Sequence, residues 1–182
     1  MSGLLPGASI SPFVAEWLPR VVAALNGRPG PRRALDLAMG EGRHAIPLVE
    51  AGFVTFGVDV AVHRLLSARR TLLGHRLDVL QWAADLDTYP LPAGHFDLLF
   101  CTRFLLRARW DDLKRSVRPG GFVIYETFTT GQLARREGPS SPDHLLQPGE
   151  LEAAFRDWAI FHAEEVHEPA ALARLVAQKP GG

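Results

Sequence analysis

The hydrophobic positions near the start of the chain repeat with a helical period. After Ser11-Pro12, apolar side chains recur about every 3.6 residues as far as Leu25, a pattern that predicts an amphipathic helix. The Gly- and Pro-rich stretch at residues 27–33 ends this helix. We therefore expect residues 1–30 to form an N-terminal helix that caps the rest of the domain.

From residue 33 onward, short apolar runs alternate with stretches of helical periodicity. Strands are predicted at 33–38, 53–58, 76–82, 96–101 and 122–128, and helices at 43–51, 62–73, 111–117 and 150–155. Alternating strands and helices favour βαβ units, which make a parallel sheet with helices on both faces. The chain is thus expected to have an α/β fold with a Rossmann-like, doubly wound sheet.

The last third of the chain is less regular. Residues 129–147 are mostly polar, and long stretches of this kind inside compact domains are often functional, so we expect a substrate lid here. Apolar stretches at 158–166 and 171–178 predict a final antiparallel pair. The second of these has a composition equally compatible with a helix. With both as strands, the mostly parallel sheet has seven strands and the last one is antiparallel.

Composition and charge narrow the class of protein. The 182 residues are 47% hydrophobic and 22% charged, as in ordinary globular proteins, and the length predicts a single domain over residues 1–182. Twenty basic side chains balance twenty acidic ones, which argues against a dedicated nucleic-acid-binding protein. We therefore expect a small-molecule partner and no nucleic acid.

Cysteine content and hydropathy indicate a reducing compartment. Cys101 is the only cysteine, so neither an intramolecular disulfide nor a multi-cysteine metal site can form, and we predict no metal. No apolar run reaches the ~18 residues of a membrane span, and the first residues lack the features of a signal peptide. The expectation is a cytoplasmic monomer or homodimer with no membrane partner.

Acidic residues and glycines gather where the first predicted strands end. Asp36 lies in the first strand, Asp59 follows the second and Asp85 follows the third, while Gly40-Glu41-Gly42 occupies the first strand-to-helix turn. Asp59 comes 19 residues after Gly40, close to the ~20 expected for a carboxylate that binds ribose hydroxyls. Ligands of open parallel sheets bind at this edge, so the pattern predicts a nucleotide site.

These motifs resemble those of the class I S-adenosylmethionine-dependent methyltransferases. The similar segments are ALDLAMGEGRH from Ala34, FGVDV from Phe56, AADLDTYPLP from Ala83, FDLLFCTRF from Phe96 and RPGGFVIYETF from Arg118. Within that family the chain is most similar to small bacterial tellurite-resistance-type methyltransferases. Ala38 departs from the pattern, since many members have the first glycine of the loop there, and we expect this variation to be tolerated.

The resemblance implies a role for each matching position. The backbone at Gly40 and Gly42 would run alongside the methionyl part and ribose of S-adenosylmethionine. Asp36 would orient the ammonium group of the cofactor, and Asp59 would accept hydrogen bonds from both ribose hydroxyls. Asp85 would accept a hydrogen bond from the adenine amino group, with Leu86 against the ring. The full set of expected cofactor-binding residues is Asp36, Ala38, Gly40, Gly42, Arg43, Asp59, Val60, Asp85, Leu86 and Thr102.

The expected chemistry is direct SN2 transfer of the methyl group to a small molecule, with S-adenosylhomocysteine as product. Because the sulfonium sulfur is a good leaving group, catalysis depends mainly on alignment of the methyl group with the acceptor and on desolvation of the acceptor. No catalytic dyad stands out in the sequence. Thr102 and Arg103 would border the methyl group. If a proton must leave, the candidates are Arg103, Glu126 and His144.

Two other interpretations stay open. The string Gly40 to Ala45 also fits a dinucleotide fingerprint, which would make the chain an NAD(P)-dependent oxidoreductase. A protein that binds S-adenosylmethionine without catalysis is the other, because Ala38 and the lack of an evident base leave room for it. Phe104, Trp110 and Phe128 either line a substrate pocket or pack in the core.

Overall fold

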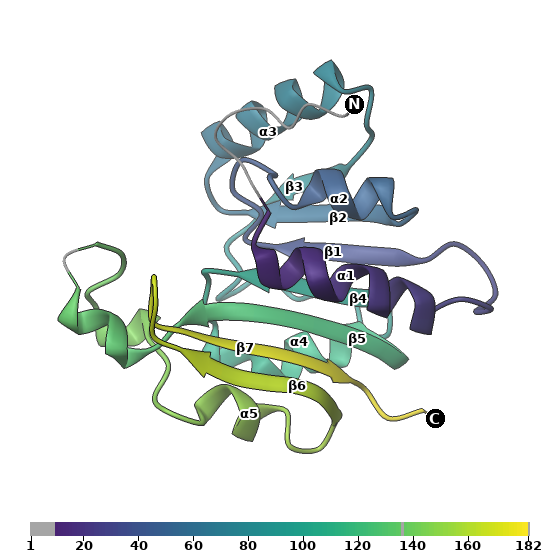
Figure 1. Ribbon diagram of the computed structural model, residues 1–182. Helices are drawn as coiled ribbons and strands as arrows, with labels where there is room; N and C mark the ends of the chain where they lie inside the picture. The colour runs from purple at the N-terminus through teal and green to yellow at the C-terminus, as the bar shows by residue number, and fades with distance from the viewer. Residues whose placement is uncertain (1–9, 136, 182) are drawn as a thin grey trace. The chain divides into compact units, whose positions relative to one another are not determined.

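The computed structural model describes residues 10–135 and 137–181 of the chain. It comprises two compact units, Met1–Ala84 (unit 1) and Asp85–Gly182 (unit 2). The seven strands follow the order β3-β2-β1-β4-β5-β7-β6, and β7 is antiparallel to both β5 and β6. The predicted α/β fold with a mostly parallel, seven-stranded, Rossmann-like sheet is confirmed (Figure 1).

Unit 1 contains three parallel strands, β1 (Arg33–Leu37), β2 (Val54–Asp59) and β3 (Leu80–Ala83). Its helices are α1 (Pro12–Ala24), α2 (Ala45–Glu50) and α3 (Val62–Gly74). The register pairs Leu37 with Val58 and Asp59 with Ala83. The carboxyl ends of the three strands therefore meet at one edge, where the glycine loop begins.

Apolar side chains from the glycine loop and two helices form one cluster in unit 1. Its buried members are Met39, Ala45, Leu65, Ala68 and Leu72. The last three repeat at helical spacing on α3, so one face of that helix packs inward. The cluster holds Met39, and with it the loop, against α2 and α3.

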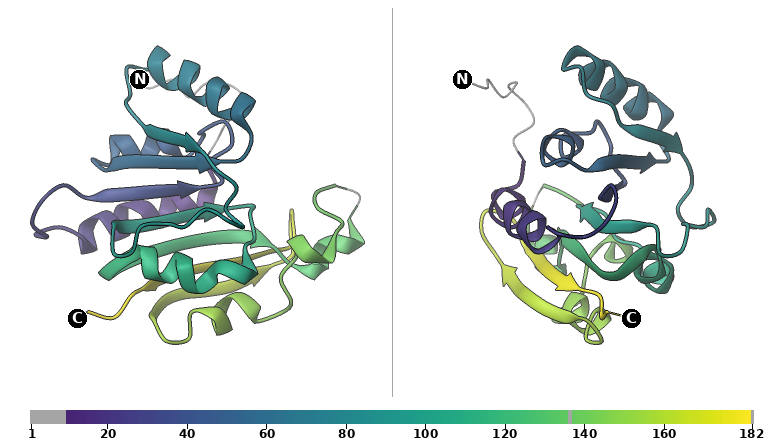
Figure 2. Two further views of the ribbon diagram at one scale, coloured as in Figure 1. Left: turned by 180° about the vertical axis from the view of Figure 1, so that it is seen from behind. Right: turned by 90° about the vertical axis from the view of Figure 1, so that its right-hand side faces the viewer.

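Unit 2 contains β4 (Phe96–Thr102), β5 (Val117–Phe128), β6 (Ala159–Val166) and β7 (Leu172–Gln178). Its helices are α4 (Trp110–Ser116) and α5 (Glu150–Ala154), with short 3-10 turns at Arg107–Arg109, Thr130–Ala134 and Pro142–His144. Lys114 Nζ on α4 donates to Ala154 O on α5 at 3.0 Å. The two helices thus lie together over the unit 2 strands (Figure 2).

Two strand starts differ from the sequence prediction by four or more residues, and one open choice is decided. The third strand begins at Leu80 rather than Arg76, because Arg76 adopts a left-handed φ of 58° in the turn that closes α3. The fifth strand begins earlier, at Val117, and takes in the Arg-Pro-Gly-Gly segment. Residues 172–178 form a strand, since backbone pairing with β5 and β6 on both edges outweighs their helix-compatible composition.

In the part of the chain that the structure describes, each helix is too short or too polar to cross a membrane. The longest have 13 residues, whereas a span needs about 20.

Candidate functional site

The carboxylate of Asp59 ties the glycine loop to the end of β2. Gly40 N donates to Asp59 Oδ2 at 2.8 Å, and Ala61 N donates to Oδ1 at 2.8 Å. The side chain is buried at the start of α3. Since a carboxylate can accept about four hydrogen bonds, capacity remains for two vicinal hydroxyls after these two bonds are made.

The glycine loop turns through left-handed backbone conformations. Gly40 and Gly42 have φ values of 56° and 76°, and Ala38 shares this conformation at 54°. Glycine adopts such angles without steric cost, whereas a residue with a Cβ atom is strained there. The predicted tolerance of Ala38 is therefore accompanied by backbone strain at the first position of the loop.

Asp36 presents a buried carboxyl group with an unused acceptor. Among the described residues, Oδ2 has no hydrogen-bond partner, although the side chain is 2% exposed. Burial raises the pKa of Asp36 to about 8; Arg43 opposes that rise and Asp59 adds to it. An ammonium ligand would supply both the missing hydrogen bond and a compensating charge, so this residue fits the methionyl end of the expected cofactor.

Within unit 1, Gly40 contacts Asp59, and Asp36 lies close enough to Arg43 and Asp59 for their charges to shift its pKa. Val60 follows Asp59 and its side chain is 69% exposed.

Three expected cofactor residues lie in unit 2. Asp85 is exposed, and its Oδ1 accepts from Asp87 N at 3.0 Å, so one oxygen caps a turn and the other is available. Leu86 is buried, and Thr102 ends β4 partly exposed. Their roles toward adenine and the methyl group remain predictions.

A cavity of about 510 Å³ opens in unit 2 beside the end of β5. Arg103 and Phe128 line it, and the Arg103 guanidinium carbon lies 5.9 Å from the centre of the Phe128 ring. Arg103 has a left-handed φ of 54°, and its backbone N donates to Glu126 O at 2.8 Å. A strained backbone of this kind is typical of positions that present a side chain for function.

The other two proton-transfer candidates are placed differently. Glu126 is buried on β5, and Arg174 Nε on β7 donates to its Oε2 at 2.7 Å. Arg174 also contacts Glu164 on β6, with Nη1 and Oε1 2.9 Å apart, so Glu126 helps to join three strands. His144 is exposed at the end of a 3-10 turn, and its role remains a prediction.

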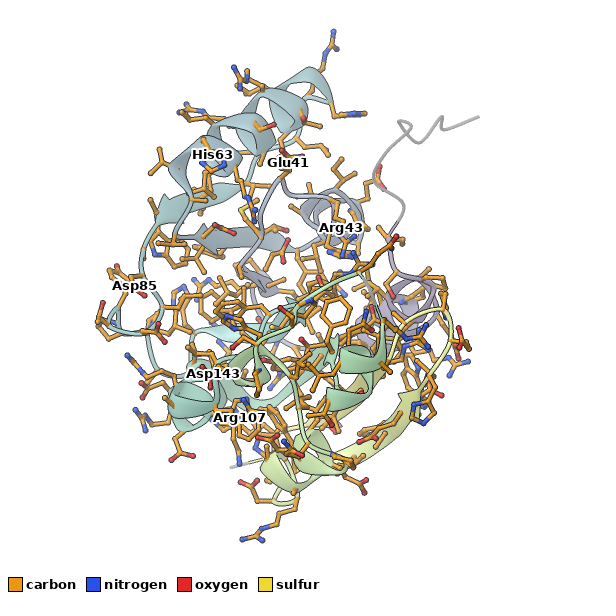
Figure 3. The ribbon with its side chains drawn as sticks, turned by 90° about the vertical axis from the view of Figure 1, so that its left-hand side faces the viewer. Glu41, Arg43, His63, Asp85, Arg107 and Asp143 are labelled. Carbon is orange, nitrogen blue, oxygen red and sulfur yellow. The ribbon has the colours of Figure 1, made fainter. Side chains whose placement is uncertain are left out.

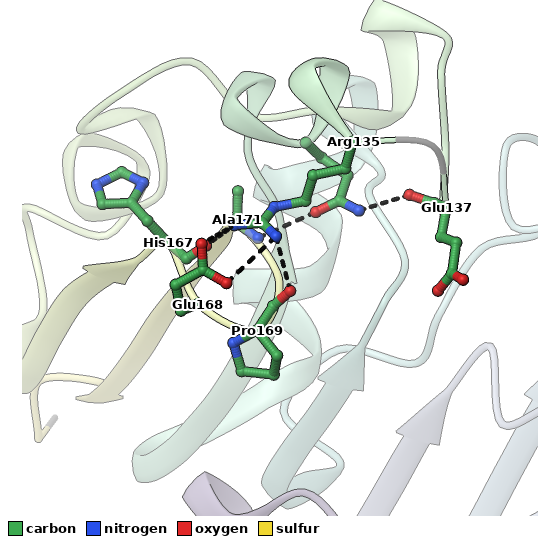
Figure 4. A network of polar contacts seen from close by, with 7 residues as sticks. Arg135, Glu137, His167, Glu168, Pro169 and Ala171 are labelled. Carbon is green, nitrogen blue, oxygen red and sulfur yellow. Dashed lines mark hydrogen bonds and ion pairs between the residues drawn. The ribbon is translucent and has the colours of Figure 1, made fainter.

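Arg135 and Gln132 fasten the segment 129–147 to the loop between β6 and β7 (Figure 4). Arg135 donates to the backbone oxygens of His167 and Pro169 and pairs with the Glu168 carboxylate. Gln132 Nε2 donates to Glu137 O at 2.6 Å, while its Oε1 accepts from Ala171 N at 3.0 Å. Both side chains also line the cavity.

The same segment is fastened at its other end by Arg107. This side chain donates to the backbone oxygens of Asp143 and Leu145 and pairs with the Glu150 carboxylate. Figure 3 labels Arg107 and Asp143, which lie near each other. Leu145 and Leu146 are fully buried.

Sequence reasoning missed Gln132 and Arg107, because their partners lie about 40 residues away along the chain and no local pattern marks them. Arg136, the neighbour with which Arg135 forms a basic pair in the sequence, lies outside the described residues.

Residues 34–121 match the family model described as a methyltransferase domain. Over 172 residues the chain is 27% identical to a ubiquinone biosynthesis O-methyltransferase of Bordetella avium, covering 83% of this chain and 69% of that protein. A Mesorhizobium loti S-adenosylmethionine-dependent methyltransferase structure has a TM-score of 0.69 and 21% identity, covering 91% of this chain and 98% of that one. TehB from Haemophilus influenzae has the same TM-score and 19% identity, covering 92% and 65%.

Proposed function

We propose that this chain, which is an S-adenosylmethionine-dependent methyltransferase with S-adenosylhomocysteine as its product, methylates a small molecule by direct displacement. The single observation that carries the cofactor site is the bond between Gly40 N and Asp59 Oδ2. It joins the loop that approaches the cofactor to the carboxylate that holds ribose. An NAD(P)-dependent oxidoreductase is not supported by the match over residues 34–121.

We propose a cofactor-binding role for residues of each unit, each unit taken by itself. In unit 1, Asp59 accepts from the ribose hydroxyls, the backbone of Gly40 and Gly42 admits the methionyl part, and Asp36 accepts from the ammonium group. In unit 2, Asp85 and Leu86 receive adenine. The whole chain would then act as one methyltransferase domain, with residues 129–147 as its substrate lid.

When bound, S-adenosylmethionine would supply an electrophilic methyl group on a sulfonium, whose sulfur would depart as a neutral thioether once the acceptor's lone pair had bonded to the methyl carbon. Such a step requires alignment and exclusion of water more than proton transfer. This agrees with a site where Glu126 is occupied by Arg174.

We assign the acceptor to the unit 2 cavity. Its volume of about 510 Å³ lies within the range of small-molecule pockets. Phe128 offers a ring face and Arg103 a guanidinium at its wall, so Arg103 is proposed to position the acceptor.

The cofactor site is tested by thermal unfolding with and without S-adenosylhomocysteine. At 100 times its dissociation constant a ligand stabilises by about 2.7 kcal/mol, roughly 5–10 °C for a chain of this size. Asp59→Asn should lose most of this shift, whereas Asp78→Asn, an exposed carboxylate in the same unit, should keep it. If the wild-type protein gives no shift, the proposed cofactor site is wrong.

Turnover is tested separately with radiolabelled S-adenosylmethionine and a panel of phenols, thiols, amines and oxyanions. Labelled product with at least one acceptor is expected, and Arg103→Gln should raise KM for that acceptor. Cofactor binding without turnover across the whole panel would instead favour a protein that binds S-adenosylmethionine without catalysis.

The buried thiol of Cys101 favours a reducing compartment, and we propose a cytoplasmic location. A fractionation assay that finds the protein outside the cell or in an oxidising compartment would contradict this.

A further inference from the structure

The outward face of α3 carries large apolar side chains that the fold does not use. Val62, Leu66 and Leu73 are 56%, 53% and 62% exposed. Successive residues of a helix turn by about 100°, which places these three within about 40° of one another. These three side chains, on one side of the helix, are called the α3 stripe below.

The α3 stripe is not needed to attach the helix to unit 1. Leu65, Ala68 and Leu72 on another face of α3 already pack into the buried cluster around Met39. A solvated helix with one inward apolar face would normally be polar elsewhere. The second apolar face therefore calls for an occupant outside the described fold.

The charged side chains of α3 and its flanking turns are of one sign between residues 60 and 77. Residues 60–77 contain Arg64, Arg69, Arg70 and Arg76 and no aspartate or glutamate. All four arginines are exposed, and no salt bridge to any of them is found within residues 10–135 and 137–181. By the same geometry Arg69 and Arg70 flank the stripe, one on each side. The chain as a whole is neutral, so this helix concentrates positive charge.

We propose that the α3 stripe and its arginines bind the surface of an anionic lipid membrane. Exposed leucines beside arginines are the composition of helices that lie in the plane of a membrane interface, with apolar side chains between the acyl chains and cations on the headgroups. Binding of this kind is peripheral and needs no spanning helix. It revises the expectation of no membrane partner and does not depend on the proposed methyl transfer.

Charge complementarity favours a lipid surface over the other occupants. A second copy of the chain would bring arginine against arginine across this face, and like charges oppose association. Nucleic acid would satisfy the arginines but would leave Leu66 and Leu73 without an apolar partner. An anionic bilayer satisfies both.

The test is co-sedimentation of the full chain with vesicles. Vesicles of equal parts phosphatidylglycerol and phosphatidylcholine are compared with pure phosphatidylcholine. The protein should sediment with the anionic vesicles, and raising the salt concentration should weaken binding because the arginines are exposed. Leu66→Ser combined with Leu73→Ser should weaken it by roughly tenfold or more, since two large apolar side chains lose their burial.

Matched variants distinguish binding through the α3 stripe from non-specific adsorption to vesicles. Tyr89→Ser combined with Arg156→Gln changes an exposed apolar residue and an exposed arginine of unit 2 and should leave vesicle binding unchanged. Arg69→Gln combined with Arg70→Gln should weaken binding to the anionic vesicles. Unfolding temperature and its shift with S-adenosylhomocysteine report folding and the cofactor site independently.

Three results would overturn the proposal. One is no sedimentation with anionic vesicles at low salt. Another is vesicle binding, or equal binding to duplex DNA, that depends on the arginines but not on Leu66 and Leu73. The third is a concentration-dependent dimer, seen by light scattering, that the leucine variant abolishes.

Discussion

Replacing Ala38 by glycine should stabilise the protein, although glycine is usually the more destabilising residue. Ala38 begins the loop between β1 and α2 and holds a φ of 54°. A side chain in this left-handed region clashes with the following carbonyl oxygen, at a cost of about 1–2 kcal/mol. Glycine removes the clash.

The expected gain is smaller than the strain. Glycine also makes the unfolded chain more flexible, which lowers stability by about 0.4–1 kcal/mol. The difference leaves a net stabilisation of roughly 0.5–1 kcal/mol for Ala38→Gly, or about 1–4 °C in Tm for a chain of this length.

Urea unfolding and calorimetry would measure this gain, with Ala15→Gly as the matched control. Ala15 is exposed on α1, so its replacement should destabilise by about 1 kcal/mol. The two substitutions are chemically identical and should have opposite signs. Equal destabilisation by both would refute the strain that we assign to Ala38.

Three further predictions concern buried or paired groups. Because the pKa of Asp36 is raised to about 8, the folded state keeps a proton that the unfolded state has lost, so the free energy of unfolding of the wild type should fall as pH rises from about 4 to 8. In Asp36→Asn this fall, measured by urea unfolding, should be smaller. The same pH dependence in both proteins would contradict the prediction. A Cβ at Gly57 would lie 2.0 Å from Met39 Sδ, so Gly57→Ala should lower the free energy of unfolding by about 1–3 kcal/mol. In a calorimetric double-mutant cycle, Met39→Ala should restore part of this loss, and strictly additive effects would contradict the prediction. The hydrogen bond from Arg107 lowers the pKa of Glu150, so this pair stabilises the fold by about 1 kcal/mol or less above pH ~4.5 and loses that contribution as pH falls further. Glu150→Gln should therefore be less stable than the wild type at pH 7 and equally stable in acid. A difference in the free energy of urea unfolding that persists in acid would contradict this.

Local patterns were sufficient to predict most of the fold. The apolar run of β4 is buried at six of its seven positions, as a strand covered on both faces must be. The 19-residue spacing between Gly40 and Asp59 pointed to a ribose-binding carboxylate, which stays a prediction; the structure adds a hydrogen bond of 2.8 Å between the two residues. Such features depend on short-range geometry, which the sequence expresses directly.

Other features depend on distant partners or on competition between faces. The α3 sequence has leucine pairs at Leu65-Leu66 and Leu72-Leu73, so periodicity alone leaves open which member of each pair is buried. The contacts of Arg135 with His167 and Glu168 span more than 30 residues. Neither outcome follows from local composition, because each is decided by the surface that the rest of the chain provides.

The position of β7 also bears on how the protein folds as it is synthesised. In unit 1, β2 pairs with both β1 and β3, and all three strands have left the ribosome well before β7 is made. In unit 2, β6 pairs only with β7 among the described strands, and β7 covers one edge of β5. Until Leu172–Gln178 emerges, both edges are exposed and able to pair with another nascent chain. Chaperone demand during translation should therefore concentrate on unit 2.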